Sequence, residues 1–74
     1  MQIEVRLFAY FRENRFKKKN MEVDESTTVL DILNQLNIKE EDASIILISG
    51  KDGKLDSKFK NGDILSLFPP VGGG

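Results

Sequence analysis

One apolar stripe at helical spacing constrains this chain more than any other feature, because strand-like patterns both precede and follow it. Its four members recur at positions i, i+3, i+4 and i+7, which share one face of a helix: Val29, Ile32, Leu33 and Leu36. Thr28 before the stripe and Asp31 three residues later predict an N-cap with a capping box, and Asn37 is the expected end of the helix. A single helix among strands predicts an α+β layer pair, with the helix across one face of a mixed sheet.

Two strands are expected before the helix. Residues Gln2 to Ala9 alternate between apolar and polar side chains, which is the pattern of a half-buried strand. Phe8 breaks this alternation, because it falls on the side that should face water. Asn20 to Asp24 is expected to be a short second strand that pairs with the first.

Three further strands are expected after the helix. Ile45 to Ile48 is a continuous apolar run, which predicts a strand that is apolar on both faces. Gly50 to Gly53 contains an Asp-Gly pair and predicts a tight turn into a short strand at Lys54 to Asp56. Phe59 is expected to anchor the next loop in the core. Ile64 to Phe68 forms the last predicted strand, whose two leucines face inward.

The composition argues against a self-sufficient enzyme. A chain of 74 residues makes one domain with a free energy of unfolding of about 5 kcal/mol and little core to spare for a deep pocket. Without cysteine, thiol chemistry within the chain is excluded. Without histidine, the commonest general base and metal ligand is missing, so no metal site is expected. These properties favour a module that works by being bound.

The segment from Arg12 to Lys19 is strongly basic. It could bind phosphate or nucleic acid, with Phe16 as a stacking ring, but it lacks a glycine-rich cradle and is more simply a solvated hairpin tip. The chain as a whole has 11 basic and 12 acidic residues, so no overall field favours nucleic acid. Residues 22–42 carry seven acids and only Lys39 as a base, and such opposed patches suit the orientation of a protein partner.

No membrane association is expected from the sequence. No apolar run approaches the length of a membrane span, and Met1 to Glu4 carries no signal peptide. The expected location is therefore the cytoplasm.

The C-terminal segment combines stiff and side-chain-free parts. After the last strand come Pro69, Pro70 and Val71, then three glycines that end at Gly74. Proline stiffens the exit from the strand, while glycine lets the backbone enter a channel too narrow for side chains. We therefore expect a folded domain at residues 1–68 and a flexible tail at 69–74. If Gly74 is the natural terminus, its α-carboxylate is the expected reactive group; the alternative is a disordered chain end without a role.

Several of these segments resemble the MoaD family, the small subunits of molybdopterin synthase within the MoaD/ThiS ubiquitin-like sulfur carriers. The similar segments span the chain: Leu7-Phe8-Ala9 with Arg12-Glu13, Thr28-Val29, Asn61-Gly62-Asp63, and Phe68 to Gly74. The resemblance implies the β-grasp (ubiquitin-like) fold, with about five strands in the order 2-1-5-3-4 and one helix packed on one face. Ser49 departs from the pattern, because many relatives have Asn there, and Gly72 makes the glycine pair a triple.

The implied strand order would bring the outward apolar residues together on one face of the sheet. Strands one, five and three would be neighbours, and their outward apolar side chains would form one patch opposite the helix: Phe8, Phe68, Ile64, Ile45 and Leu47. A contiguous exposed apolar patch usually marks a protein interface, so this patch is the predicted partner-binding surface. The alternative is that loops cover some of these side chains.

The resemblance implies a carrier and not an enzyme by itself. An E1-like adenylating enzyme of the MoaB/MoeB/ThiF type would bind the patch and use ATP to adenylate the Gly74 carboxylate, which a sulfur donor would convert to a thiocarboxylate. A molybdopterin synthase large subunit of the MoaE type would then transfer the sulfur to a pterin precursor. This chain would bind no cofactor, and would be a monomer alone and part of a heterotetramer with the large subunit. Five residues would thread into the partners' sites: Pro69, Pro70, Val71, Gly72 and Gly73.

Other functions start from the same carboxylate. The chain could carry sulfur for thiamine thiazole or tRNA thiolation, or it could be a ubiquitin-like modifier whose Gly74 forms an isopeptide bond with lysines. The Phe-Pro-Pro-Val approach to the glycines favours the molybdopterin carrier by resemblance. A plain β-grasp interaction module is a further alternative, and it would need no free terminus.

Overall fold

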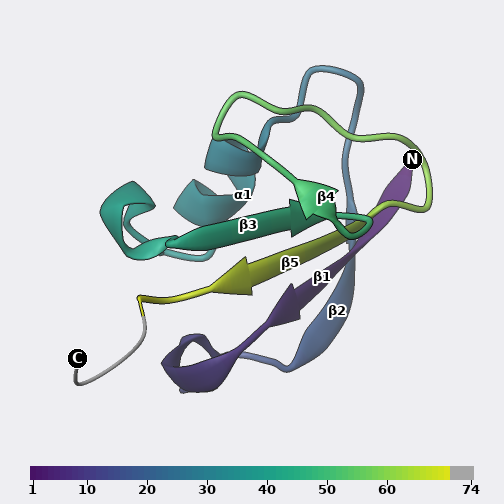
Figure 1. Ribbon diagram of the computed structural model, residues 1–74. Coiled ribbons are helices and arrows are strands. Elements are labelled where there is room, and N and C mark those ends of the chain that lie inside the picture. Colours follow the sequence, from purple (N-terminus) through teal and green to yellow (C-terminus); the bar gives the residue numbers. More distant parts are fainter. Residues whose placement is uncertain (71–74) are drawn as a thin grey trace.

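The protein folds into one mixed five-stranded sheet with a helix across one face (Figure 1). The computed structural model describes residues 1–70, so the part of the predicted tail from Val71 to Gly74 lies outside the described residues. The strand order is β2-β1-β5-β3-β4, which confirms the expected order. The strands are β1 (Gln2–Leu7), β2 (Lys18–Glu22), β3 (Ile45–Ile48), β4 (Lys51–Asp52) and β5 (Ile64–Phe68).

The helix α1 (Val29–Gln35) begins as the sequence indicates. The Thr28 side-chain oxygen accepts a hydrogen bond from the Asp31 backbone N–H at 3.3 Å, and the Asp31 carboxylate accepts one from the Thr28 N–H at 2.9 Å. This reciprocal pair satisfies two backbone donors that a helix start otherwise leaves unpaired. Asn37, the expected last residue, lies just beyond the helix with a φ of 57°, the left-handed conformation that commonly follows a helix.

Alternation along the strands places the core between the sheet and α1. Inward residues of β1 and β5 meet the apolar stripe of the helix, and Phe59 from the long loop closes one end, as expected. Twelve residues form this core: Ile3, Val5, Leu7, Phe11, Val23, Val29, Ile32, Leu33, Ile38, Phe59, Leu65 and Leu67. At ~1.5–3 kcal/mol for each fully buried large apolar side chain, this layer is the main source of folding free energy.

The sheet pairing places the first and last strands side by side. β1 and β5 are parallel, with Leu7 beside Leu67, whereas β1–β2, β5–β3 and β3–β4 are antiparallel. In the β3–β5 ladder Ile45 is the partner of Phe68. The parallel arrangement of the first and last strands places the end of β1 next to the end of β5.

The hairpin between β1 and β2 differs from the expected one. β1 ends at Leu7, two residues early, because Ala9 adopts a φ of 52° and starts the short 3-10 helix η1 (Ala9–Arg12). β2 begins at Lys18 and ends at Glu22, so it starts and stops two residues before the expected Asn20–Asp24 strand. Part of the basic segment is therefore strand, since Lys18 pairs with Arg6 of β1.

The fourth strand is β4 at Lys51–Asp52, and the expected strand at Lys54–Asp56 was wrong. The tight turn is at Ser49 and Gly50, whose φ angles are 50° and 83°. Gly53 is instead needed for packing, because a Cβ there would lie 3.0 Å from Cδ1 and Cγ1 of Ile48. Ser49 has a positive φ although it is not a glycine, and the Asn that the family resemblance implies here would tolerate the left-handed region better than most residues.

Candidate functional site

The end of β5 is held by main-chain hydrogen bonds on both sides. The Phe8 N–H donates to the Leu67 carbonyl at 3.2 Å, and the Ser44 N–H donates to the Phe68 carbonyl at 3.0 Å. Pro69 is buried, while Pro70 is exposed. The point at which the chain leaves the sheet is therefore fixed by the fold.

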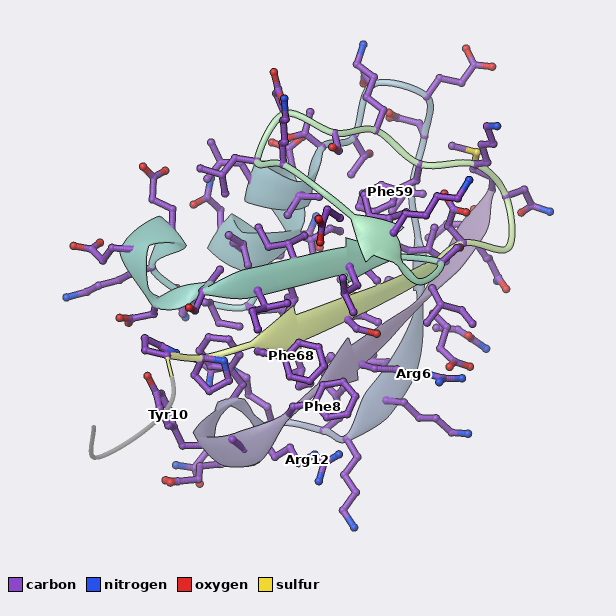
Figure 2. All side chains as sticks on the ribbon, viewed as in Figure 1. Arg6, Phe8, Tyr10, Arg12, Phe59 and Phe68 are labelled. Atoms are coloured by element: carbon purple, nitrogen blue, oxygen red, sulfur yellow. The ribbon has the colours of Figure 1, made fainter. Side chains whose placement is uncertain are left out.

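Two aromatic rings stack beside this exit point. The rings of Phe8 and Phe68 have centroids 4.2 Å apart and an interplanar angle of 10°. Figure 2 shows the pair on the face of the sheet turned away from α1, next to the end of β1. Phe8 continues the extended backbone of β1, which explains why it breaks the apolar–polar alternation: its ring pairs with the last residue of β5.

The remaining members of the predicted patch lie on the same face. Ile45 is the ladder partner of Phe68, and it is one of two exposed large apolar residues within residues 1–70, at 47%. Leu47 and Ile64 point to this face by alternation, opposite Ser66 and Glu4 respectively, and both are half-buried. The fold thus brings all five patch residues onto one face, and their role in partner binding remains a prediction.

Charged side chains frame the aromatic pair. The guanidinium carbon of Arg12 lies 5.1 Å from the Phe8 ring centroid, and its Nε donates to the Leu7 carbonyl at 2.7 Å. Arg6 forms an ion pair with Glu4 on the same face. An open hollow of about 360 Å³ lies here, lined by Arg6, Phe8, Arg12, Lys17 and Lys18. The predicted site did not include Arg6, although its outward position in the alternating β1 pattern was a usable signal.

The exit point lies between segments of opposite charge. On one side is η1, which ends at Arg12, and on the other is the short 3-10 helix η2 (Glu40–Asp42), which precedes β3 (Figure 1). No residue of η2 is buried. A partner that approaches the tail therefore meets an electrostatically polarised surface, which favours one orientation over its reverse.

Residues 1–70 contain no cluster of acidic residues that could hold a metal ion and no buried side-chain polar group that lacks a hydrogen bond. The one clear pKa shift among them is at Asp24, where hydrogen bonds from the Ser26 hydroxyl and N–H, with Thr27, lower the pKa of the carboxyl from 3.8. Asp24 stabilises the turn before α1 through these hydrogen bonds.

No helix formed by residues 1–70 has the length and apolar character needed to cross a bilayer.

The comparisons with known proteins agree with this geometry. The model of the ThiS family matches residues 5–74, which includes the whole C-terminal segment. No curated protein matches the chain by sequence.

Solved structures similar to this chain are small β-grasp proteins. SAMP1, small archaeal modifier protein 1, from Haloferax volcanii is 29% identical, with 100% of each chain covered and a TM-score of 0.79. A putative molybdopterin converting factor, subunit 1, from Pyrococcus furiosus is 28% identical over 96% of this chain and 99% of its own, with a TM-score of 0.76. A chain from the complex of subunits 1 and 2 of the molybdopterin-converting factor from Helicobacter pylori is 26% identical over 100% of both chains, with a TM-score of 0.64.

Proposed function

This chain belongs to the ThiS family, and from that premise we propose that it is a sulfur carrier whose C-terminal Gly74 is adenylated and then converted to a thiocarboxylate. The observation that carries the proposal is the family match through residue 74, joined to a fold that fixes the start of the same segment at Phe68. A segment whose start is held by the sheet reaches a partner's active site at a lower entropic cost than one that begins in a free loop.

The proposed chemistry needs activation by a second protein. The Gly74 carboxylate oxygen attacks the α-phosphorus of ATP, and pyrophosphate leaves with the electrons of the broken P–O bond. A hydrosulfide ion then attacks the carbonyl carbon, AMP leaves as the carbon–oxygen bond breaks, and loss of the sulfur-bound proton gives the thiocarboxylate. ATP is bound by an E1-like adenylating enzyme of the MoaB/MoeB/ThiF type, and this chain binds no cofactor of its own. We place these steps in the cytoplasm, where ATP is available.

We propose molybdopterin as the destination of the sulfur, with this chain as the small subunit of molybdopterin synthase. The likeness to subunit 1 of two molybdopterin-converting factors supports this choice, and one of those proteins was solved as a complex with its subunit 2. A MoaE-type large subunit would then take the tail, from Pro69 to Gly73, into its active site, in a heterotetramer. The apolar patch of Phe8, Phe68, Ile64, Ile45 and Leu47 is the proposed surface for both partners.

A protein modifier is the second candidate. The likeness to SAMP1 supports it, because that protein is by name a modifier and superposes with a TM-score of 0.79. Both candidates begin with the same acyl-adenylate, and they differ in the nucleophile that follows: sulfur for a carrier and a lysine amine for a modifier. Sulfur carriers for thiamine thiazole or tRNA thiolation share the first two steps with the molybdopterin carrier.

Intact-mass spectrometry of the protein purified from its native cell separates these candidates. A terminus in which one sulfur replaces one oxygen supports a carrier, while adducts between Gly74 and lysines of other proteins support a modifier. The control is a chain without Gly73 and Gly74, which keeps the described fold. A deletion variant that restores molybdopterin synthesis in a strain lacking the gene would overturn both candidates and leave a plain interaction module.

A further inference from the structure

Four cations surround the hollow beside the Phe8 ring. Arg6 comes from β1 and Arg12 from η1, while Lys18 begins β2 and Lys17 directly precedes it. Figure 2 shows the labelled Arg6 and Arg12 on either side of Phe8, on the face turned away from the helix. The hollow therefore adjoins the Phe8–Phe68 stack on the side of Phe8.

Most of this positive charge has no partner within residues 1–70. Arg6 pairs with Glu4, whereas Arg12, Lys17 and Lys18 form no ion pair with any described residue. In the β1–β2 ladder Arg6 and Lys18 are direct partners, so two like charges lie opposite each other. Such a pair destabilises an antiparallel sheet. A fold that keeps an unfavourable pair on an open face commonly does so for a binding function.

The geometry selects among possible anionic ligands. Phe68 covers one face of the Phe8 ring and Arg12 lies over the ring as well, so Phe8 has no face left on which a nucleobase could stack. Arg12, Lys17 and Lys18 are exposed, so the hollow lacks the enclosed donors that hold a small anion. Carboxylates carried by a protein fit better, because an apolar surface lies directly beside the cations and can supply the rest of the interface.

We propose that the hollow formed by Arg6, Phe8, Arg12, Lys17 and Lys18 receives an acidic segment of the protein that docks on the Phe8–Phe68 stack. This inference rests on the proposed function, since it takes the adenylating enzyme as that protein. Exposed charges beside an interface speed association and fix orientation more than they slow dissociation. The hollow would therefore act mainly on the encounter between the two proteins, and its effect would weaken as salt is added.

The test is the Lys18→Glu variant, which turns the repulsive Arg6–Lys18 pair into an attractive one. Adenylation is followed as ATP–pyrophosphate exchange, with the E1-like adenylating enzyme of the same organism and varied concentrations of this chain. We expect KM to rise ~10-fold at low ionic strength with kcat unchanged, and the difference to shrink at high salt. The midpoint of thermal unfolding should stay the same or rise. If Lys18→Glu is at least as stable as the wild type but has a higher KM, damage to the fold does not explain the weaker binding.

Lys54→Glu is the matched control, because this exposed lysine follows β4 at the opposite edge of the sheet and the charge change is the same. An equal rise in KM for both variants, or none for either, overturns the inference. Binding of a single-stranded RNA oligonucleotide that Lys18→Glu abolishes, with KM unchanged, overturns it in favour of nucleic acid. If the wild-type chain is not adenylated at all, the proposed function fails and the inference with it; normal adenylation of Lys18→Glu overturns the inference alone.

Discussion

The two faces of the sheet are built from the same strands, but only one of them is covered by the helix. Leu7 and Leu67 are fully buried beneath α1, whereas their chain neighbours Phe8 and Phe68 stack on each other on the face without a helix. Adjacent residues of a strand point to opposite faces, so one residue of each pair enters the core and the next one faces a possible partner. The faces differ in the helix that covers one of them and in polarity, since Glu4, Arg6 and Ser66 also lie on the open face.

The covered face supplies most of the folding free energy, whereas the open face is the proposed binding surface. The covered face holds the twelve-residue core, while the open face gains only local contacts such as the Phe8–Phe68 stack. A stacked aromatic pair adds ~0.5–1.5 kcal/mol, less than the burial of one leucine. Substitutions on the open face should therefore change binding with little loss of stability, and those on the covered face should do the reverse.

The largest expected effect on stability comes from Leu67→Ala. Leu67 is fully buried, so its truncation leaves a cavity and should lower the free energy of unfolding by about 2–5 kcal/mol. For a domain of this size that loss approaches the whole stability. Urea denaturation followed by circular dichroism measures it. The control is Ile45→Ala on the open face, 47% exposed, for which we expect a loss below ~1 kcal/mol. Equal losses for the two variants would show that the open face contributes as much to stability as the covered face.

The largest expected effect on binding comes from Phe8→Asp. A charge in the centre of the apolar patch should lower kcat/KM for adenylation by at least ~30-fold, as for a hot-spot residue, while the circular dichroism spectrum is kept. Phe8→Leu is the conservative control and should retain most of the activity. An unfolded Phe8→Asp variant would show that Phe8 belongs to the core, which would contradict the division between the faces.

A smaller loss is expected at the end of the helix that covers the core. The Arg15 guanidinium donates to the carbonyls of Leu36, Asn37 and Phe11 at 3.0 to 3.3 Å, and so ties the basic segment to the C-terminal end of α1. Arg15→Ala should lower the free energy of unfolding by ~1 kcal/mol, because these groups are partly solvated and water replaces the lost donors. Urea denaturation measures the change, with the exposed Lys39→Ala as control. A fall in adenylation kcat/KM for the folded Arg15→Ala variant would show that the helix side of the molecule also affects binding.

The smallest expected effect is a pH dependence at Asp24. Its folded-state pKa lies below 3.8, chiefly because the Ser26 hydroxyl and N–H donate to the carboxylate. The unfolded state therefore binds the proton more readily, so the contribution of Asp24 is present above pH 3.8 and lost as the pH falls through the lower, folded pKa. Thermal unfolding at pH 5 and pH 3 should show a smaller acid destabilisation in Asp24→Asn than in the wild type. An identical drop in the unfolding midpoint of the wild type and Asp24→Asn would show that the acid sensitivity comes from other carboxyl groups.

Local patterns were enough to predict several parts of the fold. The Thr28–Asp31 capping box, the apolar face of α1 and the inward leucines of β5 all follow from interactions between residues close in sequence. The resemblance to a known family added the strand order, which local patterns do not contain. The predicted position of the turn after β3 was wrong. The Asp-Gly pair is a strong local signal for a turn, but Gly53 packs against Ile48 instead.

By itself, the sequence determined the alternation that divides apolar residues between two faces, the single helix, the absence of histidine and cysteine, and the proline–glycine segment at the end. Only the tertiary structure decided that Phe8 stacks on Phe68, that Arg6 and Lys18 face each other, and that the root of the tail is held from both sides. The physical reason is that propensity and capping act over a few residues, whereas strand pairing joins residues from opposite ends of the chain. Those pairings form only once the helix and sheet bury their shared core.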